Sequence, residues 1–403
     1  MRIAITSNGP GEFAGWVRPL VRSLYERDPQ LDVTLFFVPD EYATGREASV
    51  AQAMFPALRV IEPRRYTRFA LGASAVGFPE HADLVLYLGG DLLHAVRVHK
   101  RLGGRARAYK FARPRYRNVF ERFYAVDAAN EAQLTGWGVE RARIETVGNL
   151  AVDAAFAESV AVVAGDELEP SSLDGGVLIM PGARRHEITN LVPFFLEVAV
   201  WLRRFDPRVP VAFGLSPFTT MEQVEHALAH GGDPRFWGAR GRVENDHIVP
   251  EMNGERFPIV RQSMRYATRA AVALTIPGTK CIELAALGIP SVVCAPLNAP
   301  ELVVINGPLT YLDRLPLLGP TLKRSVTLAV ARRFHFLAQP NIDAGEALMP
   351  ELRGALMPAH VAHVTLDYLQ NAAVRQRAAA ALRLLYRAHA GAAARMSASL
   401  VLA

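Results

Sequence analysis

Cysteine is scarce in this sequence. Its 403 residues include only two, Cys281 and Cys294. Both lie in apolar stretches without the C-x-x-C spacing of metal sites, which argues against a disulfide framework and against a metal site. We expect both thiols to be reduced and buried in a core, and we expect neither a metal nor an organic cofactor.

The sequence also lacks an uninterrupted apolar run of about 18 residues, the length that a membrane-spanning helix requires. Met1 and Arg2 lead directly into an apolar stretch, so we expect no signal peptide. Neither an internal repeat nor a long low-complexity segment is visible. Together these absences predict a cytosolic protein without a spanning helix.

The dinucleotide-binding fingerprint is missing as well. Residues 8–16 read NGPGEFAGW and follow a predicted strand at 2–7. The spacing of Gly9, Gly11 and Gly15 differs from G-x-G-x-x-G, which disfavours a nicotinamide cofactor. Three glycines directly after a strand still predict a turn whose backbone closely approaches a ligand.

Half of the residues are hydrophobic, and a chain of this length favours two domains over one. A polar stretch with glycine and proline at 160–175 marks the expected boundary. We therefore predict a first domain at 1–160 and a second at 161–364. Helices at about 365–403 are expected to pack back onto the first domain.

The chain carries 45 Lys and Arg against 39 Asp and Glu, and nearly all of its cations are arginine. This excess suits phosphates or an anionic lipid surface without choosing between them. Residues 105–116, with Lys110 and Arg113, either hold a diphosphate or phosphorylated lipid or form a solvated basic face. Residues 309–336 interleave leucines with basic residues. They either lie on an anionic membrane surface or pack as an amphipathic element on the domain.

The stretch at 274–296, LTIPGTKCIELAALGIPSVVCAP, predicts a strand, a tight turn, a helix and a second strand. Parallel sheets bind ligands at the carboxyl ends of their strands, where the turn Gly278-Thr279 is expected. A helix that begins there directs free N–H groups and a positive dipole end toward a phosphate. Glu283 follows one turn later and could accept hydrogen bonds from a sugar hydroxyl. The alternative is an ordinary crossover with a solvated Glu283.

A second turn of this kind follows the predicted strand at 177–180. The segment 181–187 reads PGARRHE, and it combines Gly182 with Arg184 at the start of a helix expected to reach about Phe205. Glycine and arginine at a helix N-terminus again suit a phosphate.

Asp91 follows the predicted strand at 84–88 and two glycines. An acidic side chain at that edge of a sheet is a candidate general base. The alternative is a helix N-cap for residues 92–102, and the two roles are compatible. With strands in both halves and a glycine turn at a strand end in each, the sequence predicts an α/β protein. It consists of two Rossmann-like domains facing a cleft, the architecture of GT-B nucleotide-sugar glycosyltransferases.

Several ordered blocks then resemble the lipid-A-disaccharide synthase family. Residues 179–188 (IMPGARRHEI) resemble its LLPGSRxxEI block, and residues 277–290 resemble its SGTxxLExxLxxxP block. Residues 339–352 resemble LPNLLAGxxLVxELLQ, residues 11–15 resemble the start of GExSGD, and residues 147–153 resemble VGHPLxD. These blocks span nearly the whole chain in the family's order.

The resemblance implies an activity. The family joins UDP-2,3-diacylglucosamine to 2,3-diacylglucosamine 1-phosphate in lipid A biosynthesis, with inversion, release of UDP and no metal. Asp91 would be the base that deprotonates the acceptor hydroxyl, and Glu12 would lie near the acceptor. The residues expected on the UDP-sugar side are Gly182, Arg184, Gly278, Thr279, Glu283, Asn341 and Glu346. Those expected on the acceptor side are Gly11, Gly15, Lys110 and Arg113.

The same resemblance implies partners and a location. These are a UDP-activated amino sugar, a phosphorylated glycolipid acceptor and the cytoplasmic face of the inner membrane, reached through 309–336. A second copy of the chain is a candidate partner, and no nucleic acid is expected.

The departures from the family's blocks lie in the first half. Trp16 replaces the aspartate of GExSGD, residues 109–114 (YKFARP) replace YVSPSVWAW, and Asn149 replaces a histidine. Transfer from a UDP-sugar is therefore the firmer expectation. The alternatives are a GT-B transferase with another glycolipid acceptor, a nucleotide-sugar epimerase, or a non-catalytic protein that binds a nucleotide sugar or lipid.

Overall fold

The structure is a computed structural model. It describes residues 1–40, 43–73, 76–161, 169–302 and 333–401, together with positions 324, 325, 327 and 329. The chain forms two compact units. The first comprises Met1–Ala157 and Tyr386–Ala403, and the second comprises Glu158–Leu385.

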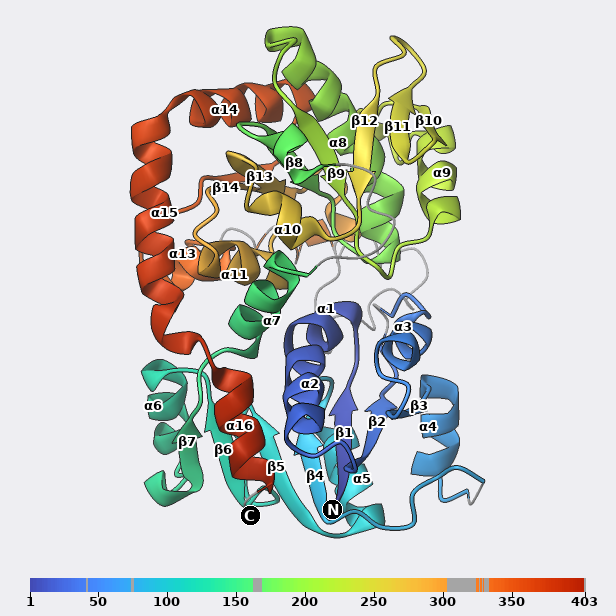
Figure 1. Ribbon diagram of the computed structural model, residues 1–403, viewed down its shortest axis with the longest axis vertical. Coiled ribbons are helices and arrows are strands. Elements are labelled where there is room, and N and C mark those ends of the chain that lie inside the picture. The colour runs from blue at the N-terminus through green and yellow to red at the C-terminus, as the bar shows by residue number, and fades with distance from the viewer. Residues whose placement is uncertain are drawn as a thin grey trace. The chain divides into compact units, whose positions relative to one another are not determined.

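The first unit is built on a seven-stranded sheet in the order β3-β2-β1-β4-β5-β6-β7 (Figure 1). All of its strand pairs are parallel. The strands are β1 (Arg2–Ser7), β2 (Asp32–Phe37), β3 (Arg59–Ile61), β4 (Leu84–Tyr87), β5 (Arg105–Tyr109), β6 (Arg122–Ala125) and β7 (Ile144–Thr146). The chain reverses its direction of travel across the sheet between β1 and β4. In doubly wound folds, ligands bind outside the carboxyl ends of the two strands at such a reversal.

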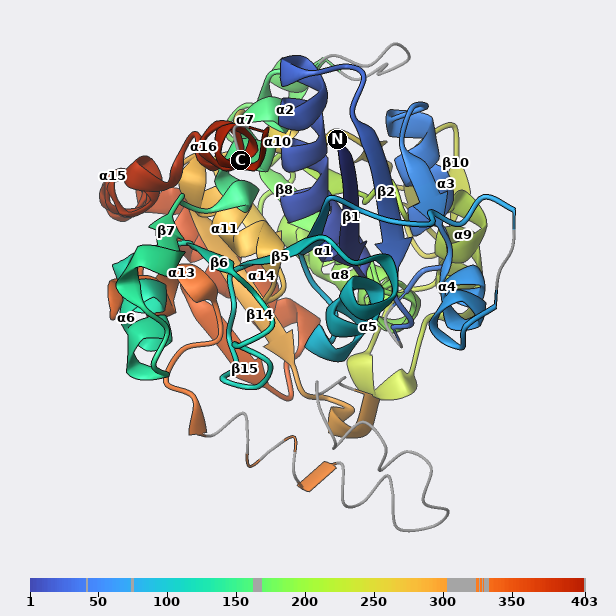
Figure 2. The same ribbon diagram turned by 90° about the horizontal axis from the view of Figure 1, so that it is seen from below.

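Helices cover both faces of this sheet (Figures 1 and 2). They are α1 (Pro10–Glu12), the π-helix Phe13–Val17, α2 (Arg18–Arg27), α3 (Glu47–Met54), α4 (Pro63–Ala70), α5 (Leu92–Leu102), α6 (Ala128–Gly136), α7 (Leu150–Ser159) and α16 (Ala392–Val401). Side chains alternate between the faces of a strand. The β5 alanines Ala106 and Ala108 accordingly join the core beneath α5, whereas Arg107 on the other face meets Ser399 of α16.

The second unit contains an eight-stranded sheet in the order β10-β11-β12-β9-β8-β13-β14-β15. Its strands are β8 (Val177–Met180), β9 (Val211–Gly214), β10 (Gly241–Glu244), β11 (His247–Pro250), β12 (Phe257–Val260), β13 (Val272–Thr275), β14 (Ser291–Pro296) and β15 (Glu351–Gly354). The pairs β10–β11 and β11–β12 are antiparallel, and the others are parallel. Here the reversal lies between β8 and β13.

The helices of the second unit again enclose the sheet. They are α8 (Arg185–Phe205), α9 (Met221–His230), α10 (Ser263–Ala267), α11 (Thr279–Ala286), α13 (Gln339–Ala344), α14 (Pro358–Gln370) and α15 (Ala372–Tyr386). Residues of α8, α9 and α14 form one large core with alternate residues of β8, β9, β13 and β14. On the opposite face Gly214 lies against Ser263 of α10 and beside Leu178 and Met180. Cys294 belongs to the large core, and Cys281 is buried in α11.

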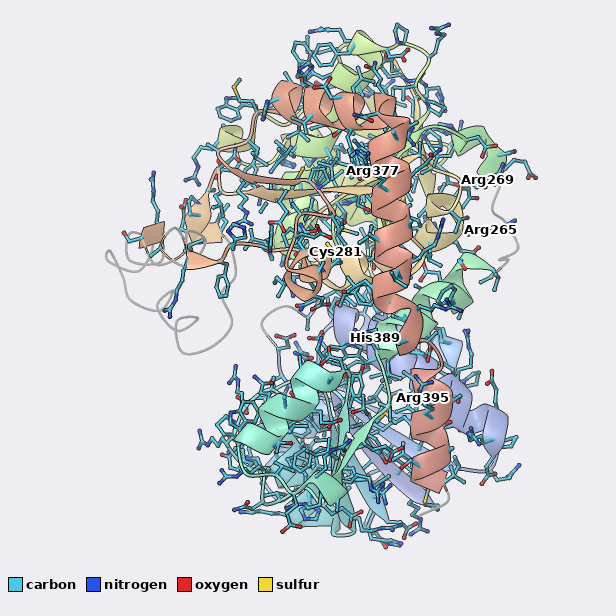
Figure 3. The ribbon with its side chains drawn as sticks, turned by 90° about the vertical axis from the view of Figure 1, so that its left-hand side faces the viewer. Arg265, Arg269, Cys281, Arg377, His389 and Arg395 are labelled. Atoms are coloured by element: carbon cyan, nitrogen blue, oxygen red, sulfur yellow. The ribbon has the colours of Figure 1, made fainter. Side chains whose placement is uncertain are left out.

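The chain returns to the first unit through α16, which packs against α2. Asp153 of α7 accepts hydrogen bonds from the N–H groups of Gly391 (2.6 Å) and Ala393 (2.6 Å) and so caps α16. Figure 3 labels Arg377 on α15, Arg395 on α16 and His389 between the two helices. The sequence placed this return at about residue 365, whereas α14 and most of α15 belong to the second unit.

Most of the segment 309–336, which we considered for membrane contact, lies outside the described residues. Within the described ranges, no helix combines the length and apolar character needed to cross a membrane.

Candidate functional site

The segments that follow β1, β2 and β4 bring three acidic side chains, Glu12, Asp40 and Asp91, to one edge of the first unit. Asn8 follows β1 and donates from Nδ2 to Asp40 at 3.1 Å. Gly89 follows β4, and a Cβ atom added to it would lie 2.9 Å from Cγ of Glu12. The structure therefore places Glu12 close to the loop that leads to Asp91.

Asp91 is exposed and begins α5. Its carboxylate accepts the N–H of Leu93 at 2.8 Å, which is an N-cap hydrogen bond. One carboxylate oxygen makes this bond, and the side chain stands at the sheet edge where substrates of α/β proteins bind. Both roles considered for Asp91 therefore remain compatible in the structure.

The pKa of the Tyr87 hydroxyl is shifted by charged side chains at this edge. Its hydroxyl donates to the carbonyl oxygen of Gly90 at 2.9 Å. Burial chiefly, and then the negative charge of Glu12, raise the pKa of the Tyr87 hydroxyl; Arg113 opposes this rise, and Asp91 adds to it. Glu12, Arg113 and Asp91 therefore all lie near enough to the Tyr87 hydroxyl to influence its pKa.

Lys110 lies at the same edge, directly after β5. Its ammonium nitrogen is 5.4 Å from the centre of the Trp16 ring, a cation–π contact. The expected cluster at 105–116 is divided, however. Arg105 and Arg107 lie within β5, and the start of β5 is at the opposite edge of the sheet from Lys110 and the exposed Arg113.

Gly11 and Gly15 lie within the helical segment and not in the turn that was expected between the strand and the helix. Gly11 lies in α1 and Gly15 in the π-helix Phe13–Val17. Neither has a positive φ, so neither is needed for backbone conformation. The extra residue in a π-helical turn shifts which side chains of the following helix face the sheet edge. Such π-helical turns are often found at functional sites.

In the second unit the carboxylate of Glu187 stabilises the turn after β8 by accepting backbone hydrogen bonds. Glu187 accepts the N–H groups of Ala183 (2.9 Å) and Arg184 (2.9 Å) with Oε2. Gly182 has φ +106°, and an added Cβ would lie 2.3 Å from that oxygen and 2.8 Å from Ile276. Glycine is required here by the packing of this turn against the residue that follows β13.

The turn after β13 differs. Gly278 is the N-cap of α11 and makes no side-chain cap hydrogen bond. A Cβ atom built on Gly278 would meet no atom within 4 Å, so the packing of the protein does not itself require glycine. Thr279 begins the helix. The N-terminus of α11 thus lies beside the Gly182 turn with its dipole directed outward.

Glu283 points inward. Its side chain is 1% exposed, and it accepts a hydrogen bond from Nζ of Lys280 at 2.6 Å. Lys280 is also 3.9 Å from Glu158. The buried carboxylate of Glu283 therefore orients Lys280 in the first turn of α11. To contact a sugar hydroxyl, Glu283 would have to accept a second hydrogen bond in addition to the one from Lys280.

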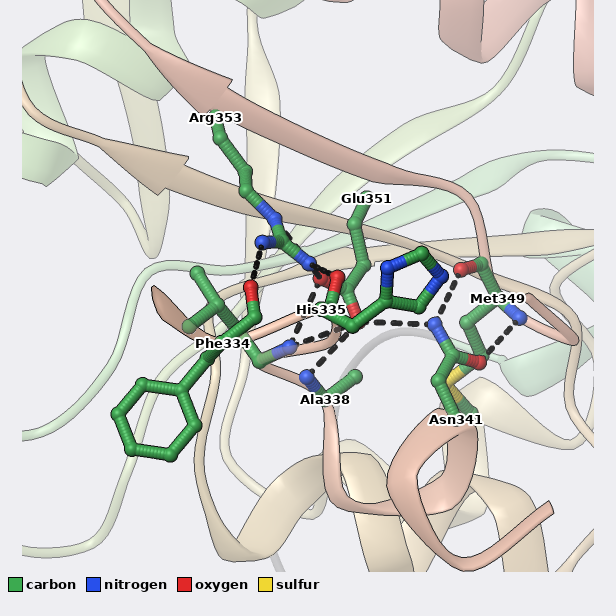
Figure 4. Close-up of polar contacts among 8 residues, drawn as sticks. Phe334, His335, Ala338, Asn341, Met349, Glu351 and Arg353 are labelled. Carbon is green, nitrogen blue, oxygen red and sulfur yellow. Dashed lines mark hydrogen bonds and ion pairs between the residues drawn. The ribbon is translucent and has the colours of Figure 1, made fainter. Parts of the chain in front are cut away.

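Asn341 and Glu346 occupy different environments. Figure 4 shows Asn341 joined to Met349 and Glu351. Its amide donates to the Met349 carbonyl and to Glu351, both at 2.8 Å, and accepts the Met349 N–H at 2.9 Å. Glu346 is exposed. The fully buried Asn341 is accounted for by the structure of its own loop.

Glu351 is the centre of this loop. It accepts the N–H groups of Leu337 and Ala338 (2.9 Å each) and pairs with Arg353. Burial alone would raise the pKa of Glu351, but these donors and Asn341 together lower it below the ordinary 4.5.

Sequence reasoning missed three polar residues at these two edges: Asn8, Asp40 and Lys280. Asn8 and Asp40 each follow a strand end within three residues, a signal that was available. Lys280 directly follows Gly278-Thr279 and was counted only as part of a helix. Among the described residues, no group of three or more His, Cys, Asp or Glu side chains is arranged to hold a metal ion.

The sequence matches no protein-family model and no curated protein. Solved structures do resemble it over its whole length. A candidate UDP-N-acetylglucosamine 2-epimerase from Listeria monocytogenes has a TM-score of 0.60 at 14% identity, over 99% of this chain and 95% of that one. The UDP-GlcNAc 2-epimerase of Neisseria meningitidis, bound to UDP-GlcNAc, has a TM-score of 0.56 at 10% identity, over 100% of both chains. The glycotransferase of kitacinnamycin has a TM-score of 0.53 at 15% identity, over 99% of this chain and 98% of that one.

At such identities the similarity establishes the fold. The protein is an α/β protein of the GT-B fold class, with two Rossmann-like units of mostly parallel strands. This confirms the fold class predicted from the sequence.

Proposed function

We propose that this protein is an inverting glycosyltransferase that uses a UDP-activated amino sugar. The observation that carries the proposal is the pair of turns after β8 and β13 in the second unit. They combine Arg184, whose side chain is 40% exposed, with the N-terminus of α11. This is a suitable site for a diphosphate, because a guanidinium and a helix dipole act on the same anion.

Gly278 supports a ligand at this edge. Since no protein atom lies where its Cβ would be, a glycine there is best explained by close approach of a ligand to the backbone. The N–H groups of Ala183 and Arg184 are bonded to Glu187. The Arg184 guanidinium, Thr279 and Lys280 are therefore the groups assigned to the diphosphate.

Asp91 is assigned the role of general base in the first unit. Its carboxylate takes the proton of the acceptor hydroxyl as the oxygen attacks the anomeric carbon. The bond from that carbon to the UDP oxygen breaks, and UDP leaves with the electron pair, which inverts the configuration. Glu12 lies near enough to orient the acceptor, and Lys110 and Arg113 supply positive charge for an acceptor phosphate.

The finer assignment follows the resemblance to lipid-A-disaccharide synthases. The donor is then UDP-2,3-diacylglucosamine, and the acceptor is 2,3-diacylglucosamine 1-phosphate or another phosphorylated glycolipid at a membrane surface. The similar structure bound to UDP-GlcNAc supports a nucleotide-sugar donor without distinguishing between acceptors.

The test is UDP release from UDP-2,3-diacylglucosamine in the presence of the acceptor. Asp91→Asn should keep the N-cap hydrogen bond and UDP binding but reduce turnover at least about 100-fold, the usual contribution of a general base. Asp127→Asn is the matched control, because Asp127 caps α6 at the same edge by accepting from Asn130 at 2.7 Å. Full turnover by Asp91→Asn would exclude Asp91 as the base, and unchanged UDP affinity in Arg184→Ala would exclude the donor site.

A nucleotide-sugar epimerase is the second candidate. Two carboxylates, Glu12 and Asp91, at the β1–β4 edge also suit proton abstraction from a sugar carbon, and two of the similar structures carry epimerase names. Isomerisation of a UDP-amino sugar without any acceptor would favour this function over transfer.

A further inference from the structure

The first unit contains a cavity at the opposite edge of its sheet from Asp91. Its volume is about 320 Å³, and it is lined by Arg105, Arg107, Glu121, Arg122, Ala142 and Arg143. Four of these six residues are arginines and one is a carboxylate. None of them belongs to the proposed transferase site.

The arginines gather here because of the strand register. Arg105 and Arg107 are two residues apart on β5 and therefore share a face of the sheet. Arg107 is the register partner of Arg122 on β6, and neighbouring parallel strands lie only about 4.8 Å apart. Like charges side by side on one face destabilise a sheet, so this arrangement calls for a compensating negative charge.

Carboxylates of the protein pair with two of these arginines, Arg107 and Arg122. Arg107 is 3% exposed and pairs with Glu121 at 2.9 Å, and Arg122 pairs with Glu145 at 3.1 Å. Arg143 donates to the backbone carbonyl oxygens of Arg117, Phe120 and Glu121. Carbonyl groups are neutral, so they fix the direction of the Arg143 guanidinium without cancelling its charge.

We propose that this cavity, the arginine pocket, is a binding site for a phosphate or diphosphate group. Guanidinium groups match phosphate oxygens with paired hydrogen bonds, and a cavity of about 320 Å³ accommodates a diphosphate. The buried Arg107 forms a fixed cationic side of the pocket, while Arg122, 42% exposed, is accessible to a ligand. The group comes either from a dissolved phosphate compound or from a lipid headgroup.

The test is calorimetric titration with pyrophosphate, carried out in Arg184→Ala protein so that the proposed donor site does not contribute. The pocket should bind pyrophosphate saturably, and the additional double change Arg105→Gln and Arg122→Gln should weaken this binding at least tenfold. Raising the salt concentration should weaken it as well, because the pocket is open to solvent screening.

Arg59→Gln is the matched control in the same background. Arg59 also lies on a strand of this sheet, is 42% exposed and pairs with one carboxylate, Asp32, but it does not line the cavity. It should leave the affinity unchanged, and unaltered far-ultraviolet circular dichroism should verify the fold of every variant. Absence of saturable binding, or equal affinity in the double variant, would overturn the proposal.

A vesicle experiment distinguishes the two sources of the phosphate. Sedimentation with phosphatidic acid vesicles but not with phosphatidylcholine vesicles, lost in the Arg105 and Arg122 variant, assigns the pocket to a lipid headgroup. Pyrophosphate binding without sedimentation assigns it to a dissolved phosphate compound.

Discussion

The carboxylate of Glu187 decides how the turn after β8 can meet an anion. It takes up two backbone N–H groups that would otherwise be available to a phosphate. The turn can therefore contribute charge through Arg184, but not the N–H groups of Ala183 and Arg184. A ligand diphosphate would have to obtain its backbone hydrogen bonds from the neighbouring turn at Gly278.

Asn341 can be tested as a structural residue. In Asn341→Ala the N–H and carbonyl groups of the buried Met349 lose their partner, which should cost roughly 2–4 kcal/mol of unfolding free energy. Urea unfolding followed by circular dichroism measures this loss. Gln339→Ala, which removes an exposed amide bonded to Asp343, should change stability by less than about 0.5 kcal/mol. UDP affinity lost without loss of stability would instead favour the binding role that the family resemblance implies for Asn341.

Glu351 should make stability depend on pH. Its pKa is lowered in the folded protein from the ordinary 4.5, so its stabilising contribution is complete above 4.5 and disappears as the pH falls through the folded value. Glu351→Gln keeps an oxygen that can accept the Leu337 and Ala338 N–H groups but has no charge to lose. Unfolding free energies measured from pH 6 to pH 3 should therefore fall less steeply in the variant. Parallel curves would contradict this role.

Among the elements, those with apolar periodicity and clear turn signals were predictable. The expected helix at 92–102 coincides with α5, and the expected strand at 177–180 coincides with β8. The strand β5, RARAY, was interpreted only as a basic segment, because two arginines conceal an apolar face formed by alanines. The antiparallel β10 and β11 were also missed, since their glutamate, histidine and arginine give no buried-strand signal.

The hydrogen bonds of Asp153 make α16 depend on a side chain far away in the sequence. Asp153→Ala removes the acceptor for the Gly391 and Ala393 N–H groups, a loss that typically costs about 1 kcal/mol at a helix N-terminus. We expect faster amide hydrogen exchange throughout α16. Asp127→Ala, which removes the cap of α6, should accelerate exchange in α6 and leave α16 unchanged. If the amides of α16 exchange at the wild-type rate in Asp153→Ala, the hydrogen bonds of Asp153 do not stabilise this helix.

At the scale of the whole molecule, the two-domain α/β class followed from repeated strand-and-glycine patterns. The residue at which the chain returns to the first unit could not be predicted from these patterns. Residues 358–386 form α14 and α15 with a break at Asn371, and their composition is as helical as that of α16. The unit that each helix joins depends on which apolar surface, far away in the sequence, the helix packs against. A single sequence does not show which surfaces pack together.

Removal of residues 386–403 should affect one unit far more than the other. Met396 and Leu400 of α16 are buried, and burial of such side chains contributes about 1.5–3 kcal/mol each. The truncated chain should show a lower unfolding midpoint for the first unit and an unchanged one for the second. Limited proteolysis with mass spectrometry identifies the unit that is cleaved. Equal sensitivity of both units would show that α16 stabilises the molecule as a whole.

The return of the chain through α16 has a consequence for how the protein is made. A ribosome synthesises residues 1–157, then the whole of 158–385, and only afterwards the segment that completes the first unit. The nascent first unit must wait, with its α2 surface uncovered and Arg107 lacking Ser399, while the second unit can already fold. During this interval the incomplete unit is the part of the protein most in need of a chaperone, and a gene fragment ending near residue 157 would encode a product that never leaves this state.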